Sequence, residues 1–405
     1  MKKLFLIWSL LSSSFCAYAQ KSIDSVYKKQ QLSKTDVEVL FSYYTQDGNH
    51  SAITGGTGTE QLHVYAPEFS ISHQSDSLNA YRLDGGVDII TSASADNIDF
   101  VKSSASRIDA RTHISLGYAR KLKTSNTHFG VGSGFSIESA YTSFPESIYV
   151  DHTNKANSRT ISAAVQCYFD DLRWGRLDPD YHHVVSLVYP AELRGVKWFN
   201  NYGRNSYNLS LAFSQVINQR MILALFPDIA YQHGLLCTPY HRVYFLNSTE
   251  KVETLPSERI KFPLGAQLNI FAGSNVIIRS YYRFYADNWG IRAHTLQLET
   301  AIKLGPLMTI TPLGRYYTQT AAKYFEPYAM HDINEAFFTS DYDLSKFSSF
   351  DLGVNVRYAP HAKLWKNYFF NDIALRYDYY KRSDGLHAHM LSTVFNINHA
   401  KMVSK

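Results

Sequence analysis

Histidines are the side chains whose spacing in this 405-residue chain comes nearest to a metal site. His387 and His389 are two residues apart, so on a strand they share one face, an arrangement that can chelate a metal ion. No third ligand is nearby in the sequence, and we interpret the two as interfacial histidines instead. His182 and His183 are adjacent, which places their rings on opposite faces of a strand. We therefore predict no metal site and no cofactor.

Nucleophilic catalysis has little support in the motifs. Serine, histidine and aspartate are common, which keeps a Ser-His hydrolase built on strands as a distant alternative. However, the chain has no nucleophile elbow, zinc signature or phosphate-binding loop. The run Gly55-Gly56-Thr57-Gly58 lacks the helix and the lysine that would follow in a phosphate-binding loop, so we interpret it as a surface loop. The prediction is that the protein is not an enzyme.

The segments that would position these side chains alternate apolar and polar residues, a period of two. In Asn205–Val216, apolar Tyr207, Leu209 and Leu211 alternate with serine, asparagine and alanine. Successive side chains of a strand point to opposite faces, so this alternation predicts a strand with one apolar face. Similar segments of ten to fifteen residues recur from about Asp36 onward, separated by turn residues. The chain is predicted to be all-β.

Composition and the arrangement of charges distinguish a transmembrane β-barrel from a soluble β-sandwich. Charged residues make up only 19% of the chain and aromatic residues 15%, with 30 Tyr and 24 Phe. After residue 20 no apolar run approaches the ~20 residues of a membrane-spanning helix. A soluble sandwich would show the same period of two. Long strands, charges confined to one face and aromatic clusters near strand ends, as in Tyr281–Tyr285, favour a transmembrane β-barrel embedded in outer-membrane lipid.

The N-terminus predicts export. Met1-Lys2-Lys3 is basic, Leu4–Leu11 is apolar, and Ala17-Tyr18-Ala19 is a small-x-small cleavage signature, which together indicate a signal peptide cleaved after Ala19. We therefore expect an outer-membrane protein of a Gram-negative bacterium, inserted by the barrel-insertion machinery. The mature chain has 38 basic and 35 acidic side chains, a net charge of +3, which does not predict a nucleic-acid partner. Cys167 and Cys237 remain after cleavage, and the sequence leaves their pairing open.

Connection lengths allow a strand count. Short turns should face the periplasm and longer loops the outside, so the two should alternate along the chain. A first count gives fifteen strands, with Tyr141–Ala156 as a long connection. Adding a strand near His182–Tyr189 restores the alternation and gives sixteen, within a range of 14 to 18. We expect a signal peptide at 1–19, a periplasmic segment at 20–35, one barrel at 36–398 and a tail at 399–405.

Four runs of sequence resemble an exported family catalogued as domain of unknown function 3570. They are TGGTGTE at 54–60, Gly86-Val87-Asp88 with TSASADNID at 91–99, TPYHRVYF at 238–245 and RYYTQTAAKYF at 315–325. The resemblance implies an outer-membrane β-barrel of unassigned activity. In relatives it also implies neighbouring genes for a thioredoxin-like protein, a small lipoprotein and a flavin-attaching transferase, a context connected with extracytoplasmic redox work.

The polar faces of the strands would line the lumen. They carry Arg82, Asp84, Asp88, Arg107, Asp109, Arg111, His113, Arg279, Arg283, Arg292, His294, Arg315, Arg357, Asp372, Arg376 and Asp378. One interpretation is a solvated lumen whose charges pair with one another. Another is an arginine ladder that selects anions, because guanidinium groups bind carboxylates in a bidentate manner. A porin-like channel is the leading functional prediction. The alternative is a non-conducting scaffold barrel for periplasmic or surface partners.

Overall fold

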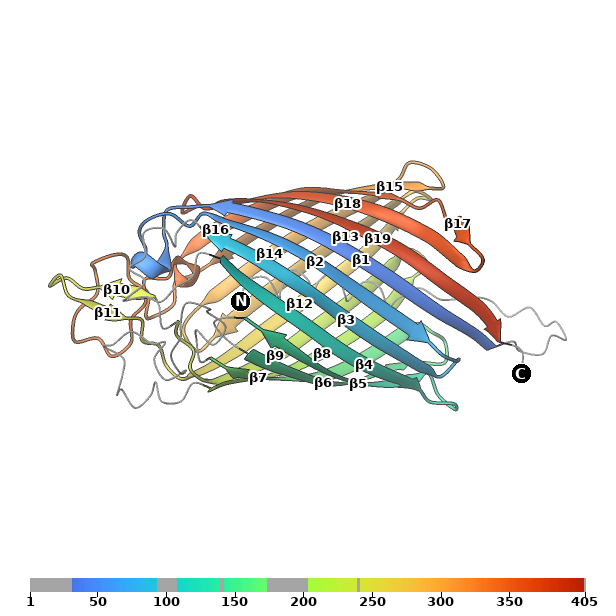
Figure 1. Ribbon diagram of the computed structural model, residues 1–405, viewed down its shortest axis with the longest axis horizontal. Helices are drawn as coiled ribbons and strands as arrows, with labels where there is room; N and C mark the ends of the chain where they lie inside the picture. The colour runs from blue at the N-terminus through green and yellow to red at the C-terminus, as the bar shows by residue number, and fades with distance from the viewer. Residues whose placement is uncertain (1–30, 93–107, 139–141, 173–202, 239–240, 404–405) are drawn as a thin grey trace.

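Sixteen long antiparallel strands close into one barrel (Figure 1). The computed structural model describes residues 31–92, 108–138, 142–172, 203–238 and 241–403. Each barrel strand pairs with its neighbours in the chain, and β1 pairs with β19 to close the ring. Within these described ranges, no helix is long and apolar enough to cross a membrane. The prediction of an all-β closed barrel of sixteen strands is confirmed.

The barrel strands are 11 to 17 residues long. They are β1 (Gln31–Asp47), β2 (Leu62–Gln74), β3 (Asn79–Ser92), β4 (Ile108–Lys121), β5 (Thr127–Ile137), β6 (Thr142–Thr153), β7 (Arg159–Asp171), β8 (Gly203–Asn218), β9 (Met221–Gly234), β12 (Glu258–Ala272), β13 (Val276–Asp287), β14 (Arg292–Lys303), β15 (Met308–Gln319), β16 (Phe347–Tyr358), β18 (Tyr368–Arg382) and β19 (His387–Val403). Among the described residues, three further strands are short: β10 (Arg242–Tyr244) and β11 (Glu250–Val252) pair only with each other, and β17 (Ala362–Trp365) pairs with the start of β18 beyond the end of β16.

The two faces of the wall differ in polarity. On β4, Ile114 and Leu116 face outward and are 49% and 63% exposed, whereas Arg111 and His113, at the alternate positions just before them, face inward and are partly buried. This alternation follows from the period of two and repeats around the ring. The outer wall is therefore apolar and the inner wall polar, as expected for a barrel surrounded by lipid.

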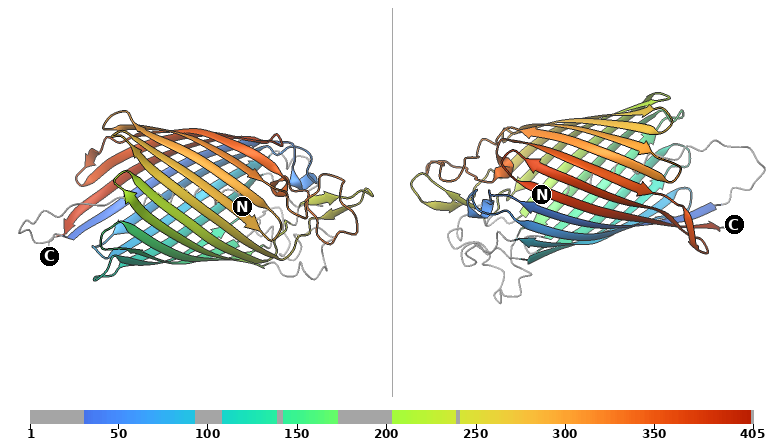
Figure 2. Two further views of the ribbon diagram at one scale, coloured as in Figure 1. Left: turned by 180° about the vertical axis from the view of Figure 1, so that it is seen from behind. Right: turned by 90° about the horizontal axis from the view of Figure 1, so that it is seen from above.

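The two ends of the barrel differ in their connections. At the turn end, where β1 begins and β19 ends, the connections are short, such as residues 154–158 between β6 and β7. At the loop end, long connections join β1 to β2, β9 to β12 and β15 to β16. In outer-membrane barrels the short turns face the periplasm. The loop end is therefore the outer mouth of the barrel (Figure 2).

The predicted position of one strand is wrong. Tyr141–Ala156, expected to be a long connection, contains β6, which pairs with both β5 and β7. The expected extra strand at 182–189 lies outside the described residues. Pro145 and Glu146 interrupt the apolar alternation of β6, which explains why its pattern was missed. Sixteen was thus the right total, but β6 rather than residues 182–189 supplies the sixteenth strand described.

The termini of the barrel extend slightly beyond the expected limits of 36 and 398, because β1 begins at Gln31 and β19 ends at Val403. The signal peptide and most of the expected periplasmic segment lie outside the described residues. Cys167 and Cys237 are both free: Cys167 lies in β7, and Cys237 is buried near the outer mouth.

Candidate functional site

Ion pairs line the inner wall of the barrel. Within the part of the chain that the structure describes, arginine guanidinium groups lie 2.5–3.8 Å from carboxylate oxygens in eight pairs on this wall: Arg82–Asp84, Arg111–Asp88, Arg204–Asp170, Arg259–Asp287, Arg279–Glu299, Arg283–Asp228, Arg357–Asp372 and Arg376–Asp378. Arg283 and Asp228 belong to β13 and β9, which are separated by β12, so their 3.8 Å contact passes over the inner face of an intervening strand. The wall therefore combines fixed charges of both signs.

Most residues predicted for the lumen lie on this inner face. Strand parity and partial burial place there Arg82, Asp84, Asp88, Arg111, His113, Arg279, Arg283, Arg315, Arg357, Asp372, Arg376 and Asp378. Arg315 lies opposite Asp351 in the β15–β16 register. Arg107 lies outside the described residues, and of Asp109 only the backbone in β4 is described. The inner face also carries Glu38 and Glu68, which the sequence analysis did not single out.

Two predicted lumen residues lie on the opposite face. Arg292 and His294 share the outer face of β14 with Leu296 and Leu298, which are 57% and 52% exposed. The Tyr282 hydroxyl, also on the outer wall, lies 2.8 Å from Nδ1 of His294. The lumen prediction is therefore wrong for these two residues. The leucines at every second position after His294 were the signal that would have placed it outside.

His387 and His389 also lie on the outer face. Their ring centroids are 6.4 Å apart, and Nδ1 of His389 lies 2.7 Å from the Tyr377 hydroxyl. Within the described ranges, no group of three or more His, Cys, Asp or Glu side chains is arranged to hold a metal ion.

Three long loops form a folded layer at the outer mouth, which we call the loop cap. It comprises residues 48–61, residues 235–257 without 239–240, and residues 320–346. The first loop joins β1 to β2 and the second joins β9 to β12, eight strand positions away in the ring of sixteen. These two loops nevertheless touch, because a Cβ added to Gly55 would lie 2.5 Å from Cδ2 of Tyr244. Loops from opposite sides of the barrel therefore meet at its mouth.

The loop cap has its own apolar core. Leu235, Cys237, Val252, Leu255 and Trp289 form one buried cluster, and Trp289 enters it from the tight turn between β13 and β14. A second cluster consists of Val243, Phe245 and Phe338. Burial of large apolar side chains stabilises a folded layer in the way that it stabilises a small domain. The cap is consequently a packed structure.

A buried polar network joins two of the loops. The Glu253 carboxylate, 2% exposed, accepts hydrogen bonds from the Thr238 backbone N–H at 2.7 Å and from the Thr339 hydroxyl at 2.5 Å. Nδ1 of His241 lies 3.6 Å from the same carboxylate. Burial lowers the pKa of His241, but the negative charges of Glu253, Asp341 and Asp343 outweigh it, so the pKa is raised overall. The network links residues 235–257 to residues 320–346.

Arg382 holds the cap to the rim of the barrel. This side chain, 2% exposed at the end of β18, donates to the Asp343 carboxylate at 2.8 Å and to the Tyr342 backbone carbonyl at 2.7 Å. Its guanidinium also stacks 3.9 Å from the centroid of the Phe347 ring and pairs with Asp384. The imidazole of His50, from the first loop, stacks on Tyr342 at 3.8 Å. These contacts fix one edge of the cap.

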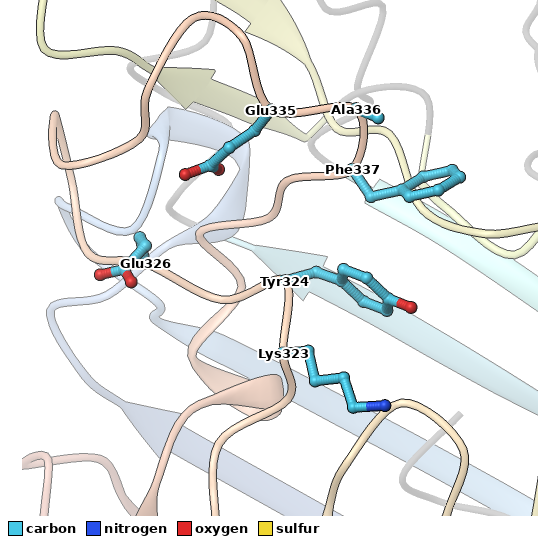
Figure 3. Close-up of a pocket in the computed structure, with 6 residues that line it drawn as sticks. All are labelled: Lys323, Tyr324, Glu326, Glu335, Ala336 and Phe337. Carbon is cyan, nitrogen blue, oxygen red and sulfur yellow. The ribbon is translucent and has the colours of Figure 1, made fainter.

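A pocket of about 310 Å³ opens in the third loop (Figure 3). The rings of Tyr324 and Phe337 pack edge to face, with centroids 5.6 Å apart, and the side chains of Glu326, Glu335 and Lys323 also line the space. The carboxylate of Glu335 also lies 2.5 Å from Nδ1 of His331. The pocket combines aromatic surface with charges of both signs.

The cap brings together three of the runs that carried the family resemblance. Gly55 and Gly56 belong to the run at 54–60, Arg242–Phe245 to the run at 238–245, and Lys323–Phe325 to the run at 315–325. Gly56 packs against the Ser340 backbone, where an added Cβ would lie 2.8 Å from the carbonyl oxygen. Sequence reasoning interpreted the glycine run as a surface loop. The buried apolar residues Val243, Phe245 and Phe338 were a signal that these loops pack, since free loops rarely contain so many.

A closed antiparallel barrel with an apolar outer wall and a charged inner wall defines a transmembrane β-barrel of the outer-membrane type. The chain belongs to the family described as "Protein of unknown function (DUF3570)", whose profile matches residues 87–393. No curated protein matches the chain.

Several solved structures are similar in fold. A bacterial polysaccharide outer membrane secretin is 11% identical, with a TM-score of 0.45 over 90% of this chain and 97% of the other. The outer membrane protein opdK from Pseudomonas aeruginosa is 8% identical, with a TM-score of 0.40 over 90% of this chain and 99% of the other. A BenF-like porin from Pseudomonas fluorescens Pf-5 is 7% identical, with a TM-score of 0.38 over 89% and 98%. At these identities the likeness concerns the fold alone.

Proposed function

We propose that the protein is a channel of the outer membrane with an entrance narrowed by the loop cap. The observation that carries the proposal is the contrast between the two faces of the wall. An inner face whose described residues form eight arginine–carboxylate pairs is built to contact water, because charges in an apolar interior would be costly. A ring of sixteen strands is wide enough for an aqueous path between such walls.

The pairing of charges bears on the selectivity. An arginine ladder without partners would give the lumen a permanent positive field and an anion preference. In the described residues, Arg279 lies 3.4 Å from Glu299, and Arg283 lies 3.8 Å from Asp228. Partners at such distances offset much of the arginine charge. We therefore propose weak selectivity, with these two loosely held pairs contributing most of what remains.

The test is the reversal potential of the reconstituted full-length protein in a salt gradient. Replacing Arg279 and Arg283 by glutamine should shift the selectivity toward cations, because Asp228 and Glu299 then lose their counter-charges. The matched control, Asp228→Asn with Glu299→Gln, should shift it toward anions by a similar amount. Identical reversal potentials in all three proteins would contradict a conducting path along this wall.

The alternative function is a scaffold barrel that binds envelope partners. One observation favours it: β17 projects at the turn end with Leu364 and Trp365 58% and 67% exposed, an apolar surface beyond the strand ends of β15 and β16. A folded barrel without conductance would favour this function. For the hydrolase alternative, no arrangement in the described part of the chain provides support, and we propose a non-enzymatic protein.

A further inference from the structure

Glu146 is an exception on the outer wall. It lies within β6 on the outward face, between Phe144 and Ile148, which are 50% and 63% exposed. Among the side chains that the structure describes, every other Asp, Glu, Lys or Arg on the outward face lies at or next to the end of its strand: Asp47, Arg120, Arg159, Asp171, Glu258, Arg292 and Lys381. Glu146 therefore places a carboxyl group within the apolar band that faces lipid.

The carboxyl group has one hydrogen-bond partner. The Ser133 hydroxyl, on the outward face of β5, donates to Oε1 of Glu146 at 2.7 Å. No other hydrogen bond or ion pair joins this carboxyl group to the residues that the structure describes. An ionisable group facing lipid is costly and generally marks a functional site. Glu146 thus retains an oxygen that can accept a hydrogen bond from a molecule in the membrane.

A trough runs along the outer wall from this carboxyl group. The pairing registers align two rows of outward side chains across β2 to β6. One row is Ile71, Leu83, Leu116, Ser133 and Glu146, and the other is His73, Tyr81, Tyr118, Val131 and Ile148. Between them lies a space of about 680 Å³, floored by the backbone at Arg82, Gly117, Gly132 and Ser147. The trough is apolar over most of its length and has its carboxyl group at one end.

Because the strands are tilted, one end of the trough lies nearer to the outer mouth and the other nearer to the turn end. Its Glu146 end lies just inside Phe135 and Phe144, whose rings are 5.2 Å apart near the outer mouth. Its other end lies at His73, next to the last residue of β2 at the turn end. An elongated molecule in the trough would therefore have its polar head toward the outer mouth and its chain toward the periplasmic side.

We propose that this trough binds a single-chain amphiphile whose head group donates a hydrogen bond or carries a positive charge, such as a long-chain amine. Charge complementarity selects this occupant. An anionic head would be repelled by the Glu146 carboxylate. A second copy of the chain is a poorer match, because its described outward surface offers no cationic side chain away from the strand ends. The aliphatic and aromatic rows provide the surface for the chain of the amphiphile.

The experiment is native mass spectrometry of the full-length protein released from a non-ionic detergent. Dodecylamine is the probe and dodecanoate its anionic counterpart. The wild type should retain one dodecylamine and no dodecanoate. Glu146→Gln should weaken binding by about tenfold, the equivalent of one charge-assisted hydrogen bond. Leu116→Trp, which fills the trough, should weaken it as well.

Two controls keep the outcome interpretable. Leu296→Trp, on the outer wall of β14, should leave binding unchanged, and gel mobility with and without heating should show that every variant is a folded barrel. Equal retention of amine and carboxylate, or retention unaffected by Glu146→Gln, would overturn the proposal. A dimer that depends on Glu146 would overturn it too, because the trough would then bind a second copy.

Discussion

Gly55 and Tyr244 lie in loops from opposite sides of the barrel, yet the Gly55 backbone packs directly against the Tyr244 ring. The φ angle of Gly55 is 78°, in the left-handed region that favours glycine. Any side chain here would meet both a backbone penalty and the ring. This contact is thus a sensitive point in the loop cap.

We predict that Gly55→Ala loosens the cap without unfolding the barrel. The left-handed backbone alone costs about 1–2 kcal/mol with alanine, and the clash with Tyr244 adds to that. Trypsin should cleave after Lys251, in β11, faster than in the wild type. Gly273→Ala is the matched control, since Gly273 has a φ of 83° but no atom within 4 Å of an added Cβ, in a turn at the other end. Equal cleavage in both variants would count against a cap held by this contact.

The cap should be more stable at acid than at alkaline pH. The pKa of His241 is raised above its ordinary value of 6.5, because Glu253 and nearby aspartates outweigh the effect of burial. A raised folded-state pKa contributes stability that is complete below the unfolded value and is lost as the pH rises through the folded value. The measurement uses a variant in which Trp289 is the only tryptophan. Acrylamide should quench the fluorescence of Trp289 more strongly at a pH above the folded-state pKa of His241 than at a pH below it. His241→Asn should abolish this difference, and a pH effect that persists would assign it to other groups.

Charge on the two faces of β8 should have unequal effects. Leu211 faces outward and is 40% exposed, whereas Ser210 faces the lumen opposite Asp228. Leu211→Arg should cost ~2–4 kcal/mol if the residue lies near the bilayer midplane, and Ser210→Arg should cost less because Asp228 can pair with the new charge. Urea titration of the barrel folded in lipid vesicles measures both. The reverse order would mean that the faces are assigned one residue out of register.

The repeating part of the fold was predictable because it follows one rule. Alternation such as that of Tyr207, Leu209 and Leu211 fixes the strand and its outward face together. The rule failed at His294, a polar residue at a membrane interface, and at β6, where Glu146 occupies an outward position. The period of two also predicts nothing about the structure of the loop cap. The contacts of Phe245 with Phe338 and of Glu253 with Thr339 join residues far apart in the chain, and no local period predicts them.

Single-channel conductance in planar bilayers shows whether the barrel conducts and whether the loop cap narrows its entrance. The wild type should be compared with a variant in which residues 241–253 are replaced by a short Gly-Ser linker, which removes most of the second loop of the cap. A narrowed channel predicts measurable conductance in the wild type and a larger conductance in the variant. No conductance in either protein, with both shown by gel mobility to be folded barrels, would contradict a channel function.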